Sequence, residues 1–227
     1  MRSGVKRLIS STEIALHVLA TILNPRTRQN LWIGDSHALF ISGCPRATVA
    51  ATPDHESIGI WLGPRLAFSV ARDGWRLPAR VRLLAKIRRF NKLIIVLGEI
   101  DCRVYLGRSN NAEYRQESWV SDFIDMTSLL AEQIRFKNLV FLSPVPPSDI
   151  CEADPEFPRN GTLTSRIEGT KWFTETVTSL VSTRTNEEVI DLQQLVGQEN
   201  GSLNPKFTVD GVHINGQGSS LIQAAIH

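Results

Sequence analysis

The chain has 227 residues, of which 42% are hydrophobic and 21% are charged, a balance that excludes a disordered or collagen-like chain. Its 25 basic and 23 acidic residues leave a net charge of +2, which gives no overall attraction to nucleic acid or to a membrane surface. The length suits one large domain that spans residues 1–227, so any specific function must come from a local site.

The first 28 residues predict a helical extension that precedes the domain. Residues 14–23 are fairly apolar but include His17, and they lead into Asn24-Pro25 instead of a cleavage site of small residues. The stretch is also shorter than the ~20 apolar residues that a membrane-spanning helix needs. We therefore expect an amphipathic packing helix here, and neither a signal peptide nor a membrane span.

Short, continuous apolar runs then recur along the chain, and each ends at a glycine, a proline or an aspartate. Runs of this kind predict strands that are buried on both faces, as in a parallel sheet. The predicted strands cover residues 31–33, 93–97, 139–142 and 189–190, with a weaker candidate at 58–62.

Helical periodicity fills the intervals between these strands. Apolar residues spaced by three and four predict helices over residues 80–90, 119–134 and 165–181, and a short closing helix over 217–226. Strands that alternate with helices imply right-handed crossovers. The sequence therefore predicts a three-layer α/β/α domain with a central parallel sheet, a flavodoxin-like arrangement.

Residues 143–164 interrupt this alternation, because they combine five prolines with four acidic residues. A loop of this length in a compact domain is often functional. Two interpretations stay open: a lid or substrate-facing loop, and a plain surface connection.

The cysteines and histidines predict neither a disulfide framework nor a structural metal site. Cys44, Cys102 and Cys151 are odd in number and share no Cys-x-x-Cys spacing, and the five histidines are scattered along the chain. We expect reduced thiols, no metal, no organic cofactor and a cytoplasmic location, with secretion as the alternative.

Chemically capable residues follow several of the predicted strands, where an open parallel sheet binds its ligands. Ser36 follows the first strand at a strand-to-helix turn, where its hydroxyl is exposed and its backbone N–H favours an anion. A serine nucleophile needs a base, and a histidine base needs an acceptor that fixes its tautomer. Asp210 and His213, three residues apart before the last helix, could fill those two roles.

The order of these motifs resembles that of the SGNH, or GDSL, hydrolase superfamily. The family's Gly-Asp-Ser block is matched by Gly34-Asp35-Ser36, its Gly-x-Asn-Asp block by residues 98–101, and its Asp-x-x-His block by Asp210 and His213. Gly63 is similar to the glycine that the family uses in its oxyanion hole. The resemblance implies a triad of Ser36, His213 and Asp210, with the N–H groups of Ser36 and Gly63 as oxyanion donors.

One residue departs from the family pattern, because Ile100 occupies the position of an asparagine that donates to the oxyanion. Either the two backbone donors suffice, or Arg103, Asn110 or Asn111 substitutes. We expect Asp101 and Arg103 to pair. Glu99, Asp101 and Arg103 then form an ion-pair network that holds this loop, or Glu99 or Arg103 touches substrate.

The neighbours of Ser36 carry two further expectations. Asp35 at the helix start is expected to accept backbone N–H groups and to hold the serine turn. His37 is either a pocket residue or a histidine with a structural hydrogen bond. A Gly-Asp-Ser-His pattern also occurs in SGNH domains that add acyl groups to polysaccharides, so the resemblance favours a carbohydrate substrate.

The resulting hypothesis is a serine esterase that hydrolyses an acyl ester, an O-acetyl group in particular, on a carbohydrate. The alternatives are a glycan O-acyltransferase with the same triad and a catalytically weak carbohydrate-binding domain. The expected partner is a small-molecule or glycan ester, with no nucleic acid. The rate is expected to rise with pH through the ordinary histidine pKa of about 6.5.

Overall fold

The computed structural model describes Leu19 and residues 29–41, 48–52, 56–87, 90–108, 112–136, 138–150 and 158–226. Most of the predicted N-terminal extension (residues 1–28) therefore lies outside the described residues. So do Cys44, Cys151, Asn110 and Asn111.

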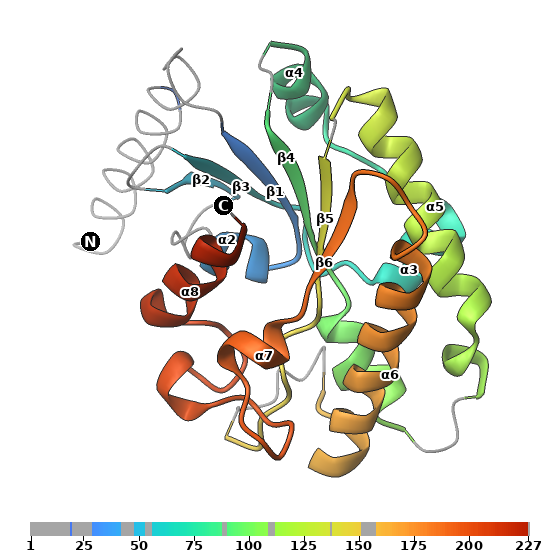
Figure 1. Cartoon of the computed structure of the whole chain (residues 1–227), viewed down its shortest axis with the longest axis vertical. Helices are drawn as coiled ribbons and strands as arrows, with labels where there is room; N and C mark the ends of the chain where they lie inside the picture. Colours follow the sequence, from blue (N-terminus) through green and yellow to red (C-terminus); the bar gives the residue numbers. More distant parts are fainter. Residues whose placement is uncertain are drawn as a thin grey trace, which may run out of the picture.

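A six-stranded sheet with the order β2-β3-β1-β4-β5-β6 forms the centre of the molecule (Figure 1). Every neighbouring pair is parallel except β2 and β3, which are antiparallel. All five predicted strands are present, whereas the short edge strand β2 was not predicted, because Val-Ala-Ala carries little strand signal. The strands are β1 Asn30–Gly34, β2 Val49–Ala51, β3 Ser57–Trp61, β4 Lys92–Val96, β5 Asn138–Leu142 and β6 Glu187–Ile190.

Helices cover both faces of this sheet, with α3, α5 and α6 on one side and α2, α7 and α8 on the other (Figure 1). The predicted three-layer α/β/α fold is thus confirmed. The α-helices are α2 His37–Ile41, α3 Ala67–Asp73, α4 Ala79–Ile87, α5 Glu117–Gln133, α6 Leu163–Val181, α7 Leu192–Val196 and α8 Gly216–Ile226. A π-helix covers Asp101–Leu106, and 3₁₀ turns cover Ala112–Arg115 and Pro205–Phe207.

The four predicted helices correspond to α4, α5, α6 and α8, but the buried face of α5 differs from the prediction. Met126 was expected on the apolar stripe and is 39% exposed, whereas Thr127 is fully buried. Thr127 occupies the inner position because its hydroxyl donates to the Phe123 carbonyl (2.7 Å) and accepts from the Trp75 indole (3.1 Å). A satisfied hydroxyl can be buried at little cost, and this frees Met126 to face outward.

Alternate residues of each central strand pack into two separate hydrophobic cores, one on each face of the sheet. In β1, Leu31 and Ile33 pack toward α3, α5 and α6, while Trp32 packs toward α2, α7 and α8. The same alternation of period two continues in β4 and β5, so these strands are buried on both faces as their continuous apolar runs predict.

The turn that leaves β1 is tight, and a glycine makes it possible. A Cβ on Gly34 would lie 1.9 Å from the Val96 carbonyl oxygen, so only glycine lets β1 lie this close to the end of β4. The next N–H, that of Asp35, donates to the same carbonyl (3.2 Å), and α2 begins at His37. Ser36 is thereby held at the carboxyl end of the central strand.

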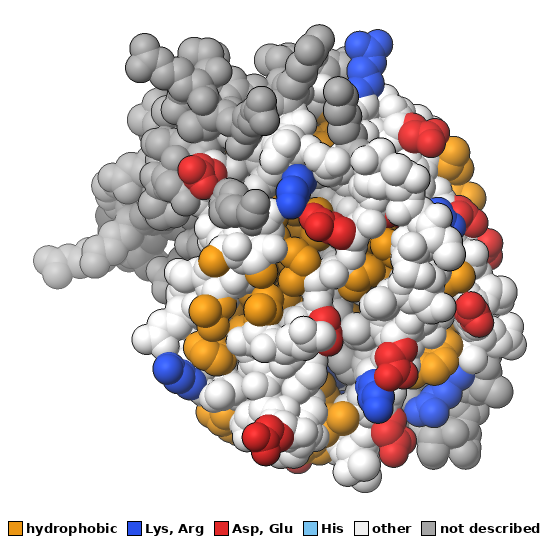
Figure 2. Space-filling view, in the orientation of Figure 1, with side chains coloured by type: hydrophobic (Ala, Val, Ile, Leu, Met, Phe, Trp, Pro, Cys, Tyr) orange, Lys and Arg blue, Asp and Glu red, His pale blue; other side chains and the backbone are white. Residues whose placement is uncertain are grey.

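Acidic and basic side chains are both present and often lie beside one another on the face shown in Figure 2, and apolar side chains gather near its centre. This mixture agrees with the small net charge of +2. Among the described helices, none combines the length and the hydropathy that a bilayer span requires.

Candidate active site

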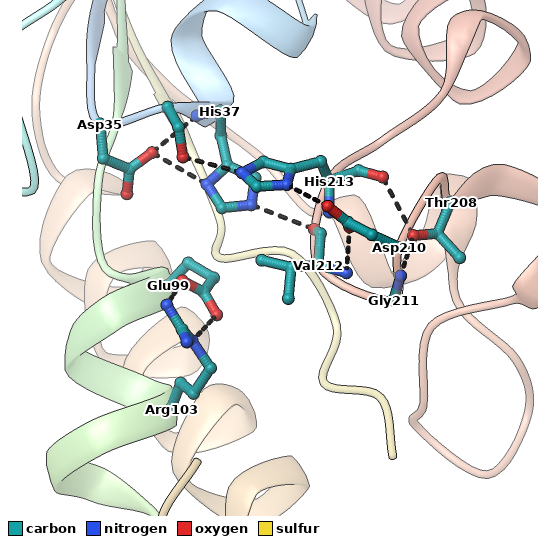
Figure 3. Close-up of polar contacts among 10 residues, drawn as sticks. Asp35, His37, Glu99, Arg103, Thr208, Asp210, Gly211, Val212 and His213 are labelled. Atoms are coloured by element: carbon teal, nitrogen blue, oxygen red, sulfur yellow. Dashed lines mark hydrogen bonds and ion pairs between the residues drawn. The ribbon is translucent and has the colours of Figure 1, made fainter. Parts of the chain in front are cut away.

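Ser36, His213 and Asp210 form one chain of hydrogen bonds, although the serine and the histidine are 177 positions apart. The Ser36 Oγ lies 3.0 Å from His213 Nε2, and His213 Nδ1 lies 2.7 Å from Asp210 Oδ2. The turn after β1 supplies the serine. The loop before α8 supplies Asp210 and His213 (Figure 3). A serine, a base and an acceptor that orients the base are the parts of a nucleophilic triad.

The loop that carries the histidine is shaped by the same aspartate that contacts its ring. Asp210 Oδ1 accepts the backbone N–H groups of Val212 (2.9 Å) and His213 (2.7 Å), while Oδ2 faces the imidazole. The Thr208 hydroxyl closes the loop from the other side, because it accepts from Gly211 N (2.8 Å) and donates to the His213 carbonyl (3.0 Å). The Asp-x-x-His spacing thus lets one carboxylate fix both backbone and ring.

The surroundings of His213 favour its neutral form. Burial lowers the pKa of His213, and the positive charge of His37 lowers it further, against the opposing effect of Asp210. Burial alone would raise the pKa of Asp210, but hydrogen bonds from the His213 ring and from the His213 and Val212 N–H groups lower it overall. At neutral pH the pair therefore consists of a neutral imidazole and a carboxylate, the state in which the ring can accept a proton.

A second aspartate–histidine pair lies beside this triad (Figure 3). Asp35 Oδ1 accepts the His37 backbone N–H and also lies 2.9 Å from His37 Nδ1. His37 Nε2 lies 3.1 Å from the Val212 carbonyl oxygen, and its ring centroid is 5.1 Å from that of His213. His37 thus both lines the cavity and makes structural hydrogen bonds, so the two interpretations of this residue are compatible.

The two expected oxyanion donors are backbone N–H groups at the ends of adjacent strands. Gly34 pairs with Trp61 in the register of β1 and β3, and the Leu62 N–H donates to the Gly34 carbonyl (2.8 Å). The next residue, Gly63, turns away with φ +89°, a value that side-chain-bearing residues rarely adopt. Within the described part of the chain, neither the Ser36 N–H nor the Gly63 N–H donates to a protein acceptor.

The ion pair after β4 differs from the prediction, because Arg103 pairs with Glu99 and not with Asp101. Arg103 Nε lies 2.7 Å from Glu99 Oε1, and Nη2 lies 3.3 Å from Oε2. Residues four apart share a helical face, whereas residues two apart do not, which explains the choice of partner. Of these three residues, Glu99 and Arg103 form an ion pair that lines the cavity, and Asp101 lies outside that pair.

Asp101 instead caps a helix that is distant in sequence. Its two carboxylate oxygens accept the N–H groups of Ala67 (2.8 Å) and Phe68 (3.1 Å) at the start of α3. Burial raises the pKa of Asp101 to about 7, although these backbone hydrogen bonds favour its charged form. Asp101 is thus part of the scaffold that holds α3 against the segment carrying Ile100.

An open cavity of about 910 Å³ lies against the triad. Ile100 is 5% exposed and contributes to its wall, at the position where the resemblance implies an asparagine. The lining residues are Asp35, Ser36, His37, Trp61, Pro64, Glu99, Ile100, Arg103, Ile150, Pro205 and residues 208–213.

The proline-rich loop is anchored near Asp149 and reaches the cavity with one described residue. Arg166, which is 2% exposed, donates to the Ser148 carbonyl (2.9 Å) and contacts Asp149 Oδ1 (2.5 Å). Ile150 is 64% exposed and lines the cavity. Residues 151–157 lie outside the described part, so both interpretations of the loop stay open.

Sequence reasoning did not identify Phe40, which stacks on the histidine of the triad. The two ring centroids are 4.1 Å apart and the planes differ by 18°. Phe40 lies one helical turn after Ser36, so the sequence could have predicted its position on the helix that follows the serine. The sequence could not have predicted its contact with His213, which lies far along the chain.

No protein-family model and no curated protein sequence matches the chain. Solved structures do match. A carbohydrate acetylesterase, Est24 from Sinorhizobium meliloti, has a TM-score of 0.53 and 18% identity over 88% of this chain and 96% of its own.

Two further solved structures are similar to the same extent. A catalytic mutant of the acetylxylan esterase Axe2 from Geobacillus stearothermophilus has a TM-score of 0.54 and 14% identity over 88% of this chain and 92% of its own. A GDSL-like lipase from Bacteroides thetaiotaomicron has a TM-score of 0.51 and 16% identity over 88% and 85%. Since the sheet order, the two helical layers and these matches all agree, the chain has the fold of the SGNH (GDSL) hydrolases.

Proposed function

We propose that this protein is a serine esterase that hydrolyses an acyl ester, in particular an O-acetyl ester, on a carbohydrate. The observation that carries the proposal is the continuous hydrogen-bonded chain from Ser36 through His213 to Asp210. This chain lies at the carboxyl end of the central strand and opens into a cavity of about 910 Å³. Cavities that hold small-molecule ligands typically measure roughly 300–1,000 Å³.

In the acylation step, the Ser36 Oγ attacks the ester carbonyl carbon while His213 Nε2 takes the hydroxyl proton. The resulting imidazolium is stabilised by Asp210, whose carboxylate is already in contact with Nδ1. The bond to the alcohol then breaks, and His213 returns the proton to the departing sugar hydroxyl. The acyl group remains on Ser36 as an ester.

The oxyanion that forms in this step needs donors that are already in place. The N–H groups of Ser36 and Gly63 fit this role, since they have no protein acceptor in the described part of the chain. In the deacylation step a water molecule repeats the attack, with His213 again as base, and releases the carboxylic acid. If a sugar hydroxyl replaces the water, the same steps transfer the acyl group.

The carbohydrate part of the proposal has two supports. Est24 and Axe2, which share the fold, are a carbohydrate acetylesterase and an acetylxylan esterase. The cavity wall of this chain also combines Trp61 with the Glu99–Arg103 pair. An indole face and a polar pair suit a sugar ring, which is apolar on its faces and carries hydroxyls at its edge.

A second candidate function, a carbohydrate-binding domain with little turnover, is favoured by one observation. Ile100, whose side chain cannot donate a hydrogen bond, lines the cavity at the position where the resemblance implies a donor. Binding without hydrolysis in the assays below would favour this candidate.

The first prediction concerns the nucleophile. A fluorophosphonate probe should add a single group to the protein, and tryptic mapping should place it on Ser36, because its hydroxyl lies within hydrogen-bond distance of Nε2 of the proposed base. Ser36→Ala should abolish labelling and lower hydrolysis of an activated acetyl ester by about 10³-fold or more.

The matched control is Ser220→Ala, which removes an exposed hydroxyl that bonds only within α8. This variant should label and hydrolyse like the natural protein. Labelling at another residue, or equal turnover by Ser36→Ala, contradicts the assignment.

The second prediction concerns pH. Since His213 must be neutral to accept the proton, kcat/KM should rise with pH through its pKa, which burial and the His37 charge hold below the ordinary value of about 6.5. The rate should therefore have reached its plateau by neutral pH. The measurement is kcat/KM from about pH 4.5 to pH 8, with folding checked by circular dichroism. A profile without an acid limb would rule out His213 as the base.

The third prediction concerns the departure at Ile100. Removal of one oxyanion donor typically costs ~10²–10³-fold in rate, so the natural protein should be slow on a simple activated ester. Arg103 is an unsuitable replacement because it donates to Glu99 through two nitrogens. Ile100→Asn should therefore raise kcat by about tenfold or more.

The control for this change is Ile100→Leu, which keeps the side chain apolar and should leave the rate near that of the natural protein. A fast natural enzyme that Ile100→Asn leaves unaltered would show that the oxyanion hole is already complete.

A further inference from the structure

We propose that Asp35 and His37 form a buried ion pair whose imidazole ring ties the His213 loop to the nucleophile turn and places a positive charge beside His213 that keeps it unprotonated. This inference deepens the proposed function, because it rests on His213 as the base of Ser36. His37 is not a catalytic residue in this account, since it acts on the reaction only through His213.

The tether is visible in the hydrogen bonds of one imidazole ring. His37 Nδ1 lies 2.9 Å from Asp35 Oδ1, and Nε2 lies 3.1 Å from the Val212 carbonyl oxygen (Figure 3). Val212 lies between Asp210 and His213 in the loop that carries the proposed base. The ring is 2% exposed, so it spans the gap between the nucleophile turn and the base loop without competition from solvent.

The charge of His37 follows from what its two nitrogens face. A neutral imidazole has one N–H donor, but here both nitrogens face an oxygen that only accepts, so two donors are needed. Asp35 is also 1% exposed, and its Oδ2 accepts no hydrogen bond from any residue that the structure describes. A buried carboxylate in this position requires a counter-charge, and His37 is in direct contact with it.

The balance of interactions agrees with a protonated His37. Burial lowers its pKa, but the charge and hydrogen bond of Asp35, the charge of Glu99 and the Val212 carbonyl together raise the pKa to about 9. His37 is therefore protonated throughout the range in which histidine bases usually titrate.

This cation lies close enough to His213 to affect its protonation. The two ring centroids are 5.1 Å apart and the planes are inclined by 31°, while Phe40 stacks on His213 at 4.1 Å. A second positive charge on His213 would be repelled across this short distance. The other charged groups that act on the two rings or on their direct partners are Asp35 and Asp101 beside the nucleophile turn, Glu99 with its partner Arg103 after β4, and Asp210 on the loop.

His37 contributes two effects, the hydrogen bond to the Val212 carbonyl (the tether) and a positive charge. Two conservative substitutions distinguish these effects. His37→Gln removes the charge but keeps an amide donor at the distance of Nε2, so it can still reach the Val212 carbonyl. His37→Asn also removes the charge but keeps a donor only near Nδ1, so the bond to the loop is lost. Both variants also leave the Asp35 carboxylate without its counter-charge. An unpaired negative charge there also raises the pKa of His213, as loss of the His37 charge does.

The experiment follows the protonation of His213 directly. Imidazole ¹H–¹⁵N spectra are recorded as a function of pH for the natural protein and both variants, with the His213 signals identified from His213→Gln. In both variants the pKa of His213 should rise by about one pH unit, which is the size of a screened charge interaction at this distance. The acid limb of kcat/KM should move to higher pH by the same amount.

The plateau rate separates the tether from the charge. His37→Gln should retain most of the plateau kcat, whereas His37→Asn should lose about tenfold more, because a loosened base is held less well against the serine. Lys171→Gln is the matched control, since it removes an exposed positive charge from α6, and it should change neither the pKa of His213 nor the plateau. A merely structural His37 would lower stability without moving the His213 titration.

The outcomes are distinguishable from those that test the proposed function. If both variants leave the titration of His213 unchanged, the charge role is overturned, whatever the activity. If the titration moves but the natural protein hydrolyses no ester, the pair is supported and the esterase proposal fails. If neither variant folds, the natural protein decides: two protonated nitrogens on His37 at about pH 8 support the proposal, and one overturns it.

Discussion

The hydrogen bond between Ser36 and His213 is the contact on which the proposed chemistry depends. It requires α2 and α8 to keep a fixed position relative to each other. Ser36 directly precedes α2, and His213 lies three residues before α8. Two side chains of α8, Ser219 and Gln223, donate to the carbonyl of Ile41 at the end of α2 (2.6 and 3.0 Å). The segment that contains Ser36 and α2 is thus joined to the segment that contains His213 and α8 at two points, the active site and this buried contact.

Electrostatics in the site follow from pairing each buried or half-buried carboxylate with a specific partner. Asp210 faces His213, Asp35 faces His37, and Glu99 faces Arg103. Two of the partners are cations, and the third is a base that its surroundings keep neutral. A positive neighbour beside a base lowers its proton affinity, while the aspartate behind it stabilises the proton once transferred. The arrangement therefore suits a base that must be free near neutral pH.

Sequence patterns predicted the parts of this site that depend on local order. Continuous apolar runs predicted the buried strands, and the family resemblance predicted that Ser36, Asp210 and His213 lie in one site. Contacts made through space were not predictable in this way. Asp101 was expected to pair with Arg103, but it caps α3 because the fold brings Ala67 and Phe68 to it. The bond from His37 to Val212 likewise joins segments 175 positions apart, and no spacing in the sequence encodes it.

A crystal structure of the phosphonate adduct would test the central claim most directly, namely that Ser36 reacts within a hole made by two backbone donors. We expect a covalent bond from Ser36 Oγ to phosphorus, with the phosphoryl oxygen about 3 Å from the N–H groups of Ser36 and Gly63. His213 Nε2 should then face the oxygen that represents the leaving group. A phosphoryl oxygen directed at Arg103, with Gly63 out of reach, would contradict this account of the oxyanion hole.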